Sequence, residues 1–175
     1  MKKTIVLFLM LAIFVASAFT IEVKGHALAP VAGYPNIVGV EYDMLINDKL
    51  TAYGSLNYSL AYGLYSGVDV TLGVEYRIGT IKLALADVDT SLFDVDLGAQ
   101  TTGAFYYDWE ERKMTPAFTL TATIKLSTDL KFNDFKFSFF SRTALGLGIG
   151  KGLKFPLKAK TGFAVGAQVG VLFKL

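Results

Sequence analysis

The sequence predicts an all-β fold, an eight-stranded antiparallel up-and-down transmembrane β-barrel that follows an N-terminal signal peptide. Two observations favour it. Apolar residues alternate with small or polar residues through almost the whole chain beyond the N-terminus. Mean hydropathy is positive and only 18% of the residues are charged, yet the sequence holds a single helix-length apolar run. A hydrophobic chain without spanning helices is expected to cross a membrane with strands.

The helix-length apolar run has the pattern of a secretory signal peptide. Lys2 and Lys3 precede the unbroken apolar stretch 5–16, and Ala16-Ser17-Ala18 supplies an A-x-A cleavage site. An uncleaved anchor is the alternative, but the run is shorter than the roughly 20 residues of a spanning helix. We therefore predict a signal peptide over residues 1–18. Residues 19–36 carry two prolines and no clear pattern, so they are expected to form a periplasmic segment before a barrel over 37–175.

Eight segments carry the two-residue alternation of a strand whose two faces differ. The fourth segment follows a predicted tight turn at Gly79-Thr80, and its pattern stops at Asp87. The eight predicted strands are residues 37–46, 50–62, 68–78, 81–86, 92–107, 117–132, 135–150 and 159–175. Residues between them are typical of turns, such as Asn47-Asp48-Lys49 and Asn133-Asp134. Short connections of this kind favour an up-and-down order.

An even number of strands places both termini at the periplasmic end of such a barrel. The outer loops are then expected at residues 47–49, 79–80, 108–116 and 151–158, and the periplasmic turns at 63–67, 88–91 and 133–134. The two longest loops fall outside, as is usual for membrane barrels.

The volume of the side chains indicates which face is inside. A soluble ligand-binding barrel or a sandwich would bury the apolar face, but an eight-stranded barrel has little interior space. The apolar face holds about 45 residues, many of them Leu, Tyr and Phe, which is too much bulk for that interior. The other face is mostly Gly, Ala, Ser and Thr. We therefore expect the apolar face to meet lipid.

Aromatic residues lie toward the ends of the predicted strands, as in the aromatic belts of membrane barrels. One belt is predicted to hold Tyr42, Tyr76, Phe105, Tyr107, Trp109 and Phe118, and the other Tyr58, Tyr62, Phe132, Phe135, Phe137 and Phe173. The alternative is the ordinary enrichment of aromatic residues in strands.

Charged residues on the small face are nearly balanced in sign. They are Glu41, Asp43, Asp69, Glu75, Arg77, Lys82, Asp94, Asp96, Lys125, Lys136 and Arg142. Buried charges are normally paired, so these residues are expected to form an ion-pair network that closes the lumen. A selectivity ring in a narrow pore is the alternative. Asp94 and Asp96, together with Asp69, could also bind a cation, although an Asp-x-Asp sequence is a weak signal.

The sequence contains little that favours catalysis. Its one histidine, His26, lies before the first predicted strand and is expected to be an exposed tail residue. A Ser-His pair therefore has no candidate on a strand or outer loop. No cofactor or metal site is expected. The net charge of +2, without a basic block, excludes nucleic acid as an expected partner.

The signal peptide, eight alternating strands, aromatic strand ends and apolar C-terminal strand resemble the small bacterial outer-membrane barrels of the OmpA, OmpX and OmpW type. The resemblance covers essentially all of the chain beyond the signal peptide and is architectural. It implies an outer-membrane location, membrane lipids as partners, and recognition of the last strand, which carries Phe173 and Leu175 on its apolar face, by the assembly machinery.

We therefore expect a non-enzymatic, monomeric outer-membrane barrel with a structural or interaction role, and at most a narrow pore for ions or small solutes. The alternative function is a soluble exported barrel that binds an apolar ligand.

Overall fold

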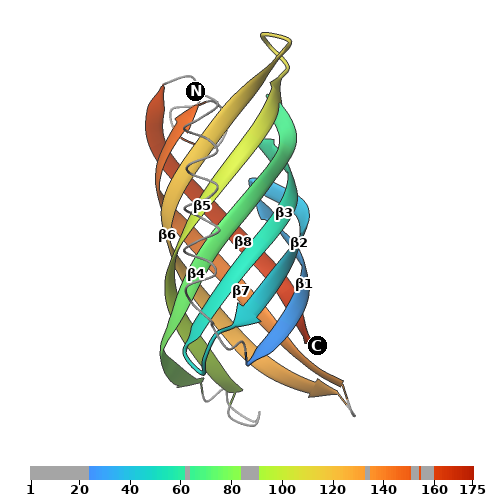
Figure 1. Ribbon diagram of the computed structural model, residues 1–175, viewed down its shortest axis with the longest axis vertical. Coiled ribbons are helices and arrows are strands. Elements are labelled where there is room, and N and C mark those ends of the chain that lie inside the picture. Colours follow the sequence, from blue (N-terminus) through green and yellow to red (C-terminus); the bar gives the residue numbers. More distant parts are fainter. Residues whose placement is uncertain (1–23, 62–63, 84–90, 133–134, 151–153, 155–159) are drawn as a thin grey trace, which may run out of the picture.

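The computed structural model describes residues 24–61, 64–83, 91–132, 135–150, 154 and 160–175. Within them, eight antiparallel strands close into one barrel in which each strand pairs with its neighbours in sequence and β1 pairs with β8 (Figure 1). The strands are β1 (Gly25–Tyr34), β2 (Asn36–Leu45), β3 (Leu50–Ala61), β4 (Tyr65–Leu83), β5 (Ser91–Asp108), β6 (Lys113–Phe132), β7 (Phe135–Gly150) and β8 (Thr161–Lys174). The predicted fold class is confirmed. The predicted signal peptide lies outside the described residues.

The register of the strands tilts them strongly against the barrel axis. A path across the paired residues begins at Gly25, the first residue of β1. It passes through Leu45, Thr51, Glu75, Gly98, Thr123, Ala144 and Gly166, which are partners in successive strands. It returns beside Tyr34, the last residue of β1. One turn around the barrel therefore displaces the register by a whole strand, and this stagger fixes the tilt.

The first strand is a correction to the sequence analysis. Residues 25–34, predicted to be periplasmic, form β1 and close the barrel against β8, so the barrel begins at Gly25 and not at residue 37. His26 is therefore a strand residue on the outer surface, where its ring stacks on Tyr42 with centroids 5.6 Å apart. The prediction that it is a tail residue is wrong.

The fourth strand is the second correction. Residues 79–80 do not turn, because β4 runs without a break from Tyr65 to Leu83. Arg77 pairs with Asp96 and Gly79 with Val95, so Ile78 is an extra residue in the β4–β5 ladder, a β-bulge. The predicted strand 68–78 and the described part of the predicted strand 81–86 belong to one strand, and residues 84–86 lie outside the described residues. The missed β1 and the divided β4 cancel, which is why the predicted count of eight is still right.

The two corrections reverse the direction of the early strands. We call the end of the barrel with Gly25 and Lys174 the terminal end, at the bottom of Figure 1, and the other the far end. The turn at residues 46–49 lies at the terminal end, and Leu64, just before β4, lies at the far end, both opposite to the prediction. From β5 onward, each strand runs in the predicted direction between the two ends of the barrel. The predicted loops at 88–90, 133–134, 151–153 and 155–158 themselves fall outside the described residues.

The β5–β6 connection is shorter than predicted. The strands continue to Asp108 and resume at Lys113, so the expected loop over 108–116 is reduced to a turn at residues 109–112. Lys113 pairs with Asp108, and Pro116 with Phe105. These pairs continue β5 and β6 into a projecting hairpin, the tallest feature at the far end in Figure 1.

The outer surface is apolar on all eight strands. Exposed side chains include Leu28 on β1, Leu56 on β3, Leu72 on β4, Leu120 on β6 and Leu147 on β7, each between 42% and 66% exposed. The strands that carry them are long enough to cross a bilayer, since β1 and β2 have 10 residues each and β6 has 20. In the described part of the chain, no helix has the length and apolarity needed to cross a membrane.

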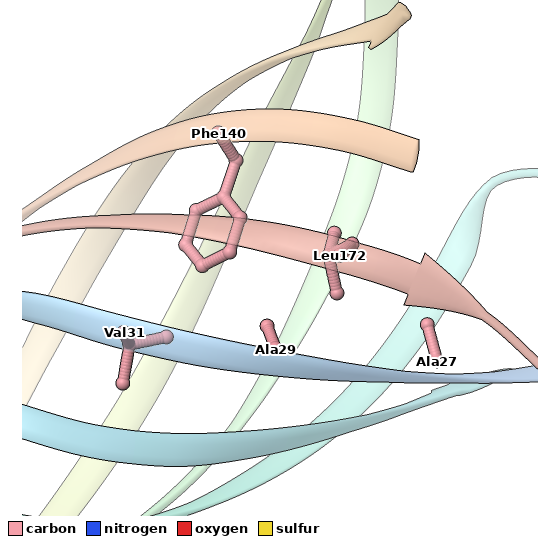
Figure 2. Packing of buried hydrophobic residues seen from close by; sticks show 5 residues of the cluster. All are labelled: Ala27, Ala29, Val31, Phe140 and Leu172. Atoms are coloured by element: carbon pink, nitrogen blue, oxygen red, sulfur yellow. The ribbon is translucent and has the colours of Figure 1, made fainter. Parts of the chain in front are cut away.

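A small apolar cluster fills the lumen where β1 meets β8. Ala27, Ala29 and Val31 of β1 face Leu172 of β8 and Phe140 of β7 (Figure 2). The inner face of β1 is therefore apolar like its outer face, and this removes the contrast on which the sequence prediction of a strand depends.

Candidate functional site in the barrel lumen

Five of the predicted lumen charges meet at one level of the barrel. We call Glu41, Asp43, Glu75, Lys125 and Arg142 the central charge cluster. They come from β2, β4, β6 and β7, and each side chain is at most 4% exposed. Each of the five side chains points into the lumen because it lies on the same face of its strand as the small residues that line the interior.

Arg142 joins both acidic walls. Its Nη1 and Nη2 atoms donate to the two carboxylate oxygens of Glu41 at 2.5 and 2.9 Å, a bidentate pair. Its Nε donates to Glu75 Oε1 at 2.6 Å, and Nη1 also donates to the Gln168 side-chain oxygen at 2.8 Å. The guanidinium thus ties β7 to β2, β4 and β8.

Lys125 completes the cluster from β6. Its Nζ donates to Glu75 Oε2 at 3.0 Å and to Asp43 Oδ2 at 3.3 Å. Glu75 accepts from both cations and lies at the centre of the network. The cluster thus joins two cations to three carboxyl groups.

Two aromatic side chains enclose the cations, and the predicted site residues did not include them. The Arg142 guanidinium lies 3.9 Å from the centroid of the Tyr53 ring, and the Lys125 ammonium lies 4.7 Å from that of Phe140. Their bulk on a face of small residues was the signal in the sequence. Gly73 and Gly170 make room for these rings, since a Cβ there would lie 2.3 Å from Tyr53 Cζ and 2.5 Å from Phe140 Cε1.

The other predicted charges lie apart from the central charge cluster. Arg77 pairs with Asp94 through Nη1 at 3.0 Å and with Asp96 through Nε at 3.3 Å, nearer the terminal end. Lys82 is exposed on the part of β4 beyond the bulge, and the side chain of Lys136 lies outside the description.

Asp69 is on the far-end side of the cluster, among Asn57 and Ser59. The structure therefore does not bring Asp94 and Asp96 together with Asp69.

In the described part of the lumen, small cavities lie on either side of the central charge cluster. A cavity of about 40 Å³ lies toward the far end, where Arg142, Gln168 and Thr121 line it. Another of about 120 Å³ lies toward the terminal end, beside Asp43, Arg77 and Lys125. Such volumes hold a few water molecules. Between the first cavity and the far mouth, Tyr65 and Tyr106 are buried with Ala104 and Ala117.

The aromatic residues follow the corrected strand directions. Phe105, Tyr107, Trp109 and Phe118 lie near the far end as one belt, and Tyr58 joins them, because its partner Val68 also faces Phe105. Tyr42 and Tyr76 lie near the terminal end with Phe137 and Phe173, opposite to the prediction. Tyr62 and the side chains of Phe132 and Phe135 lie outside the description.

The arrangement is suited to closing a barrel. Among the described residues, no group of three or more His, Cys, Asp or Glu side chains is placed to hold a metal ion. His26 lies on the outer surface, away from the lumen carboxylates. The cluster carboxylates are engaged by cations, so the geometry stabilises the contact of opposite walls.

These features define a class, the small eight-stranded up-and-down barrel with an apolar outer surface and a charged, filled lumen. Among solved structures, the chain is similar to the crystal structure of the N-terminal β-barrel domain of Pseudomonas aeruginosa OprF. The two share 13% sequence identity with a TM-score of 0.50, over 88% of this chain and 100% of that one. No protein-family model and no curated protein matches the sequence. The likeness supports the predicted small-barrel fold.

Proposed function

We propose that the protein is an outer-membrane β-barrel with a structural or interaction role, whose lumen allows at most a narrow passage for ions or small solutes. The observation that carries the proposal is the apolar outer surface, in which large side chains on all eight strands are exposed. A surface of this extent is stable in lipid and would associate in water. The fold shared with the OprF barrel domain supports the barrel architecture on which the proposal depends.

The filled lumen supports the closed state. The cavity between the central charge cluster and the far mouth has a volume of about 40 Å³, too small for a hydrated solute to pass. Opening a passage would separate Arg142 from Glu41 and Glu75, and leave buried charges without partners. The protein is therefore proposed to act through its surfaces and to have no catalytic activity.

The membrane itself is the proposed partner of the outer surface. Recognition of β8 by the outer-membrane assembly machinery follows from the same proposal, and a monomer is expected because the closed barrel pairs its strands internally. The alternative, a soluble barrel that carries an apolar ligand, needs its apolar face inside. Here that face is outside and the lumen is polar or filled.

Membrane fractionation tests the location. The protein should remain in the membrane fraction through washing with high salt and alkaline carbonate, and should require detergent for release. A detergent-free soluble pool after cell lysis would instead support the soluble barrel.

Planar-bilayer recording tests the lumen separately. The reconstituted protein should give no conductance or small, brief steps. Large and stable conductance steps would overturn the closed lumen without affecting the membrane location.

A further inference from the structure

A hollow in the apolar outer surface lies across β6, β7 and β8 toward the far end of the barrel. Its volume of about 480 Å³ is within the roughly 300–1,000 Å³ of small-molecule sites. We call it the β6–β8 groove. Two rows of paired, outward-facing residues border it, and their five large apolar side chains are between 45% and 66% exposed. The rows are Leu120, Leu147 and Phe163, and Phe118, Ile149 and Thr161.

The groove is hollow because its floor and one of its corners lack bulk. Gly148 and Gly162 also line it and are paired between the two rows, so the floor is bare backbone. Thr161 is the shortest side chain of the two rows. Beside it, no described strand continues the wall, because β1 ends at Tyr34 opposite Ala167. The groove is therefore open on its β8 side.

The position and lining of the groove suit a hydrocarbon chain. Thr161 is the one lining residue with a polar side chain, and none of the lining residues is charged. Phe118 belongs to the aromatic belt near the far end, and such belts lie at the level of the lipid headgroups. The groove therefore runs from that level into the apolar band of the bilayer, where acyl chains lie.

An exposed cation lies directly above the groove. Lys160 precedes Thr161, and its carbonyl oxygen accepts a hydrogen bond from the Gly150 N–H at 3.1 Å. It thus extends the β7–β8 ladder by one residue beyond the pair of Ile149 and Thr161. Its side chain is exposed. Long lysine side chains at a membrane interface extend to the headgroups, so the ammonium group can reach a lipid phosphate.

The backbone of β8 supplies polar groups at the same height. In an antiparallel strand, alternate residues direct their N–H and C=O groups to opposite sides. Half of the groups in residues 161–166 therefore point to the side where no described strand lies. Backbone polar groups beside lipid need partners, and the ester and hydroxyl oxygens below a lipid headgroup can accept hydrogen bonds from the N–H groups.

We propose that the β6–β8 groove and Lys160 form a binding site for one anionic phospholipid. An acyl chain lies between the two rows of side chains, and the Lys160 ammonium binds the phosphate. Along β8 the apolar Phe163, the open backbone edge and the cationic Lys160 follow one another in the order of chain, ester and phosphate in a lipid. Ordinary lipid contact requires only the apolar surface. The site rests on the proposed membrane location.

Native mass spectrometry of the full chain, released from detergent micelles, tests the headgroup part of the site. The probes are phosphatidylglycerol and phosphatidylcholine with identical acyl chains. The wild type should retain one phosphatidylglycerol saturably and bind it about fivefold more tightly than phosphatidylcholine, the preference expected from one lysine at a membrane surface. Lys160→Gln should remove the preference and leave phosphatidylcholine retention unchanged. Lys49→Gln, at an exposed lysine of the terminal end, should keep it.

Filling the groove tests the acyl-chain part of the site. Thr161 faces outward beside Ile149, so Thr161→Phe places a ring in the groove and should abolish the saturable retention of both lipids. The matched control is Ala99→Phe, which fills another outer hollow, of about 420 Å³, beside Leu72 and Val74. This variant should retain phosphatidylglycerol as the wild type does.

Equal affinity of the wild type for the two lipids would overturn the proposal, as would a preference that survives Lys160→Gln. Unchanged retention by Thr161→Phe would also overturn it. Heat-modifiable migration in detergent gels verifies that each variant is folded, and if Thr161→Phe does not fold, the wild type and Lys160→Gln decide the question. Recovery of the protein in the soluble fraction would contradict the membrane location itself, whereas equal affinities in a membrane-embedded barrel contradict only the lipid site.

Discussion

Arg142 is the residue on which the interior of the barrel depends most. It contacts acidic residues from two strands and stacks on Tyr53, so its removal leaves buried Glu41 without a cation and Glu75 with Lys125 alone. Arg142→Met should lower the free energy of unfolding by about 3–5 kcal/mol, the range for breaking a buried pair from one side. Urea unfolding in lipid vesicles measures this quantity.

The matched control for this substitution also neutralises the carboxylate that loses its cation. The double variant Arg142→Met/Glu41→Gln should lose less stability than the sum of the two single variants, because Glu41 is then neutral and Glu75 keeps Lys125. Additive losses would contradict a coupled ion network at this level.

Gly170 tests the packing of the apolar cluster beside the network. A Cβ at this position would lie 2.5 Å from Phe140 Cε1 and 3.0 Å from the Pro30 carbonyl oxygen. Gly170→Ala should therefore cost about 1–3 kcal/mol in urea unfolding. At Gly103 a Cβ has nothing within 4 Å, so Gly103→Ala should leave stability unchanged or raise it by up to about 1 kcal/mol. Equal losses at both glycines would show that packing is not the cause.

At the scale of the strand, the bulge in β4 makes a prediction about deletions. Ile78 has no partner of its own in the β4–β5 ladder, so deleting it joins Arg77 to Gly79 in continuous register. The variant should fold with a stability within about 1 kcal/mol of the wild type. Migration of heated and unheated samples in detergent gels, followed by urea unfolding, measures both properties.

Deleting Leu72 is the control, because it is an ordinary paired residue within the same strand. Its loss shifts one part of β4 by one residue and turns that part's lumen side chains toward lipid. This variant should fail to form the compact species. Similar behaviour of the two deletions would contradict the assignment of Ile78 as the bulge.

The bulge also shows how far alternation predicts a strand. Even-numbered residues are apolar through Ile78, whereas Ile81 and Leu83 are odd-numbered, so the phase changes near Gly79. A turn and a one-residue bulge both change the phase, and the sequence does not distinguish them. The result was a predicted turn inside a continuous strand.

β1 was missed for a different physical reason. Its inner residues Ala27, Ala29 and Val31 are apolar because they pack on Phe140, and its outer residues include Leu28 and Pro30. Hydropathy therefore does not alternate, and a proline argues against a strand. Its pairing with β2 on one side and with β8 on the other makes this segment a strand.

At the scale of the whole molecule, the inward face was predictable and its contacts were not. Alternation indicated that Glu41, Glu75 and Arg142 face the lumen, because the face of a side chain depends only on its odd or even position along the strand. Which charges meet depends on the stagger of the barrel, and this brings Arg142 to Glu41 at a separation of 101 residues. The same stagger separates Asp69 from Asp94, although both were predicted lumen acids.

Spin-label accessibility in lipid vesicles tests the central claim, an apolar surface in the bilayer around a filled lumen. The chain has no cysteine, so single cysteines can be labelled without background. Labels at Val70, Leu72 and Leu120 should collide readily with oxygen and rarely with a water-soluble nickel chelate. Labels at Thr71 and Thr119 should be protected from both. Frequent nickel collisions at the first three positions, or oxygen collisions of the lipid type at the last two, would contradict the account.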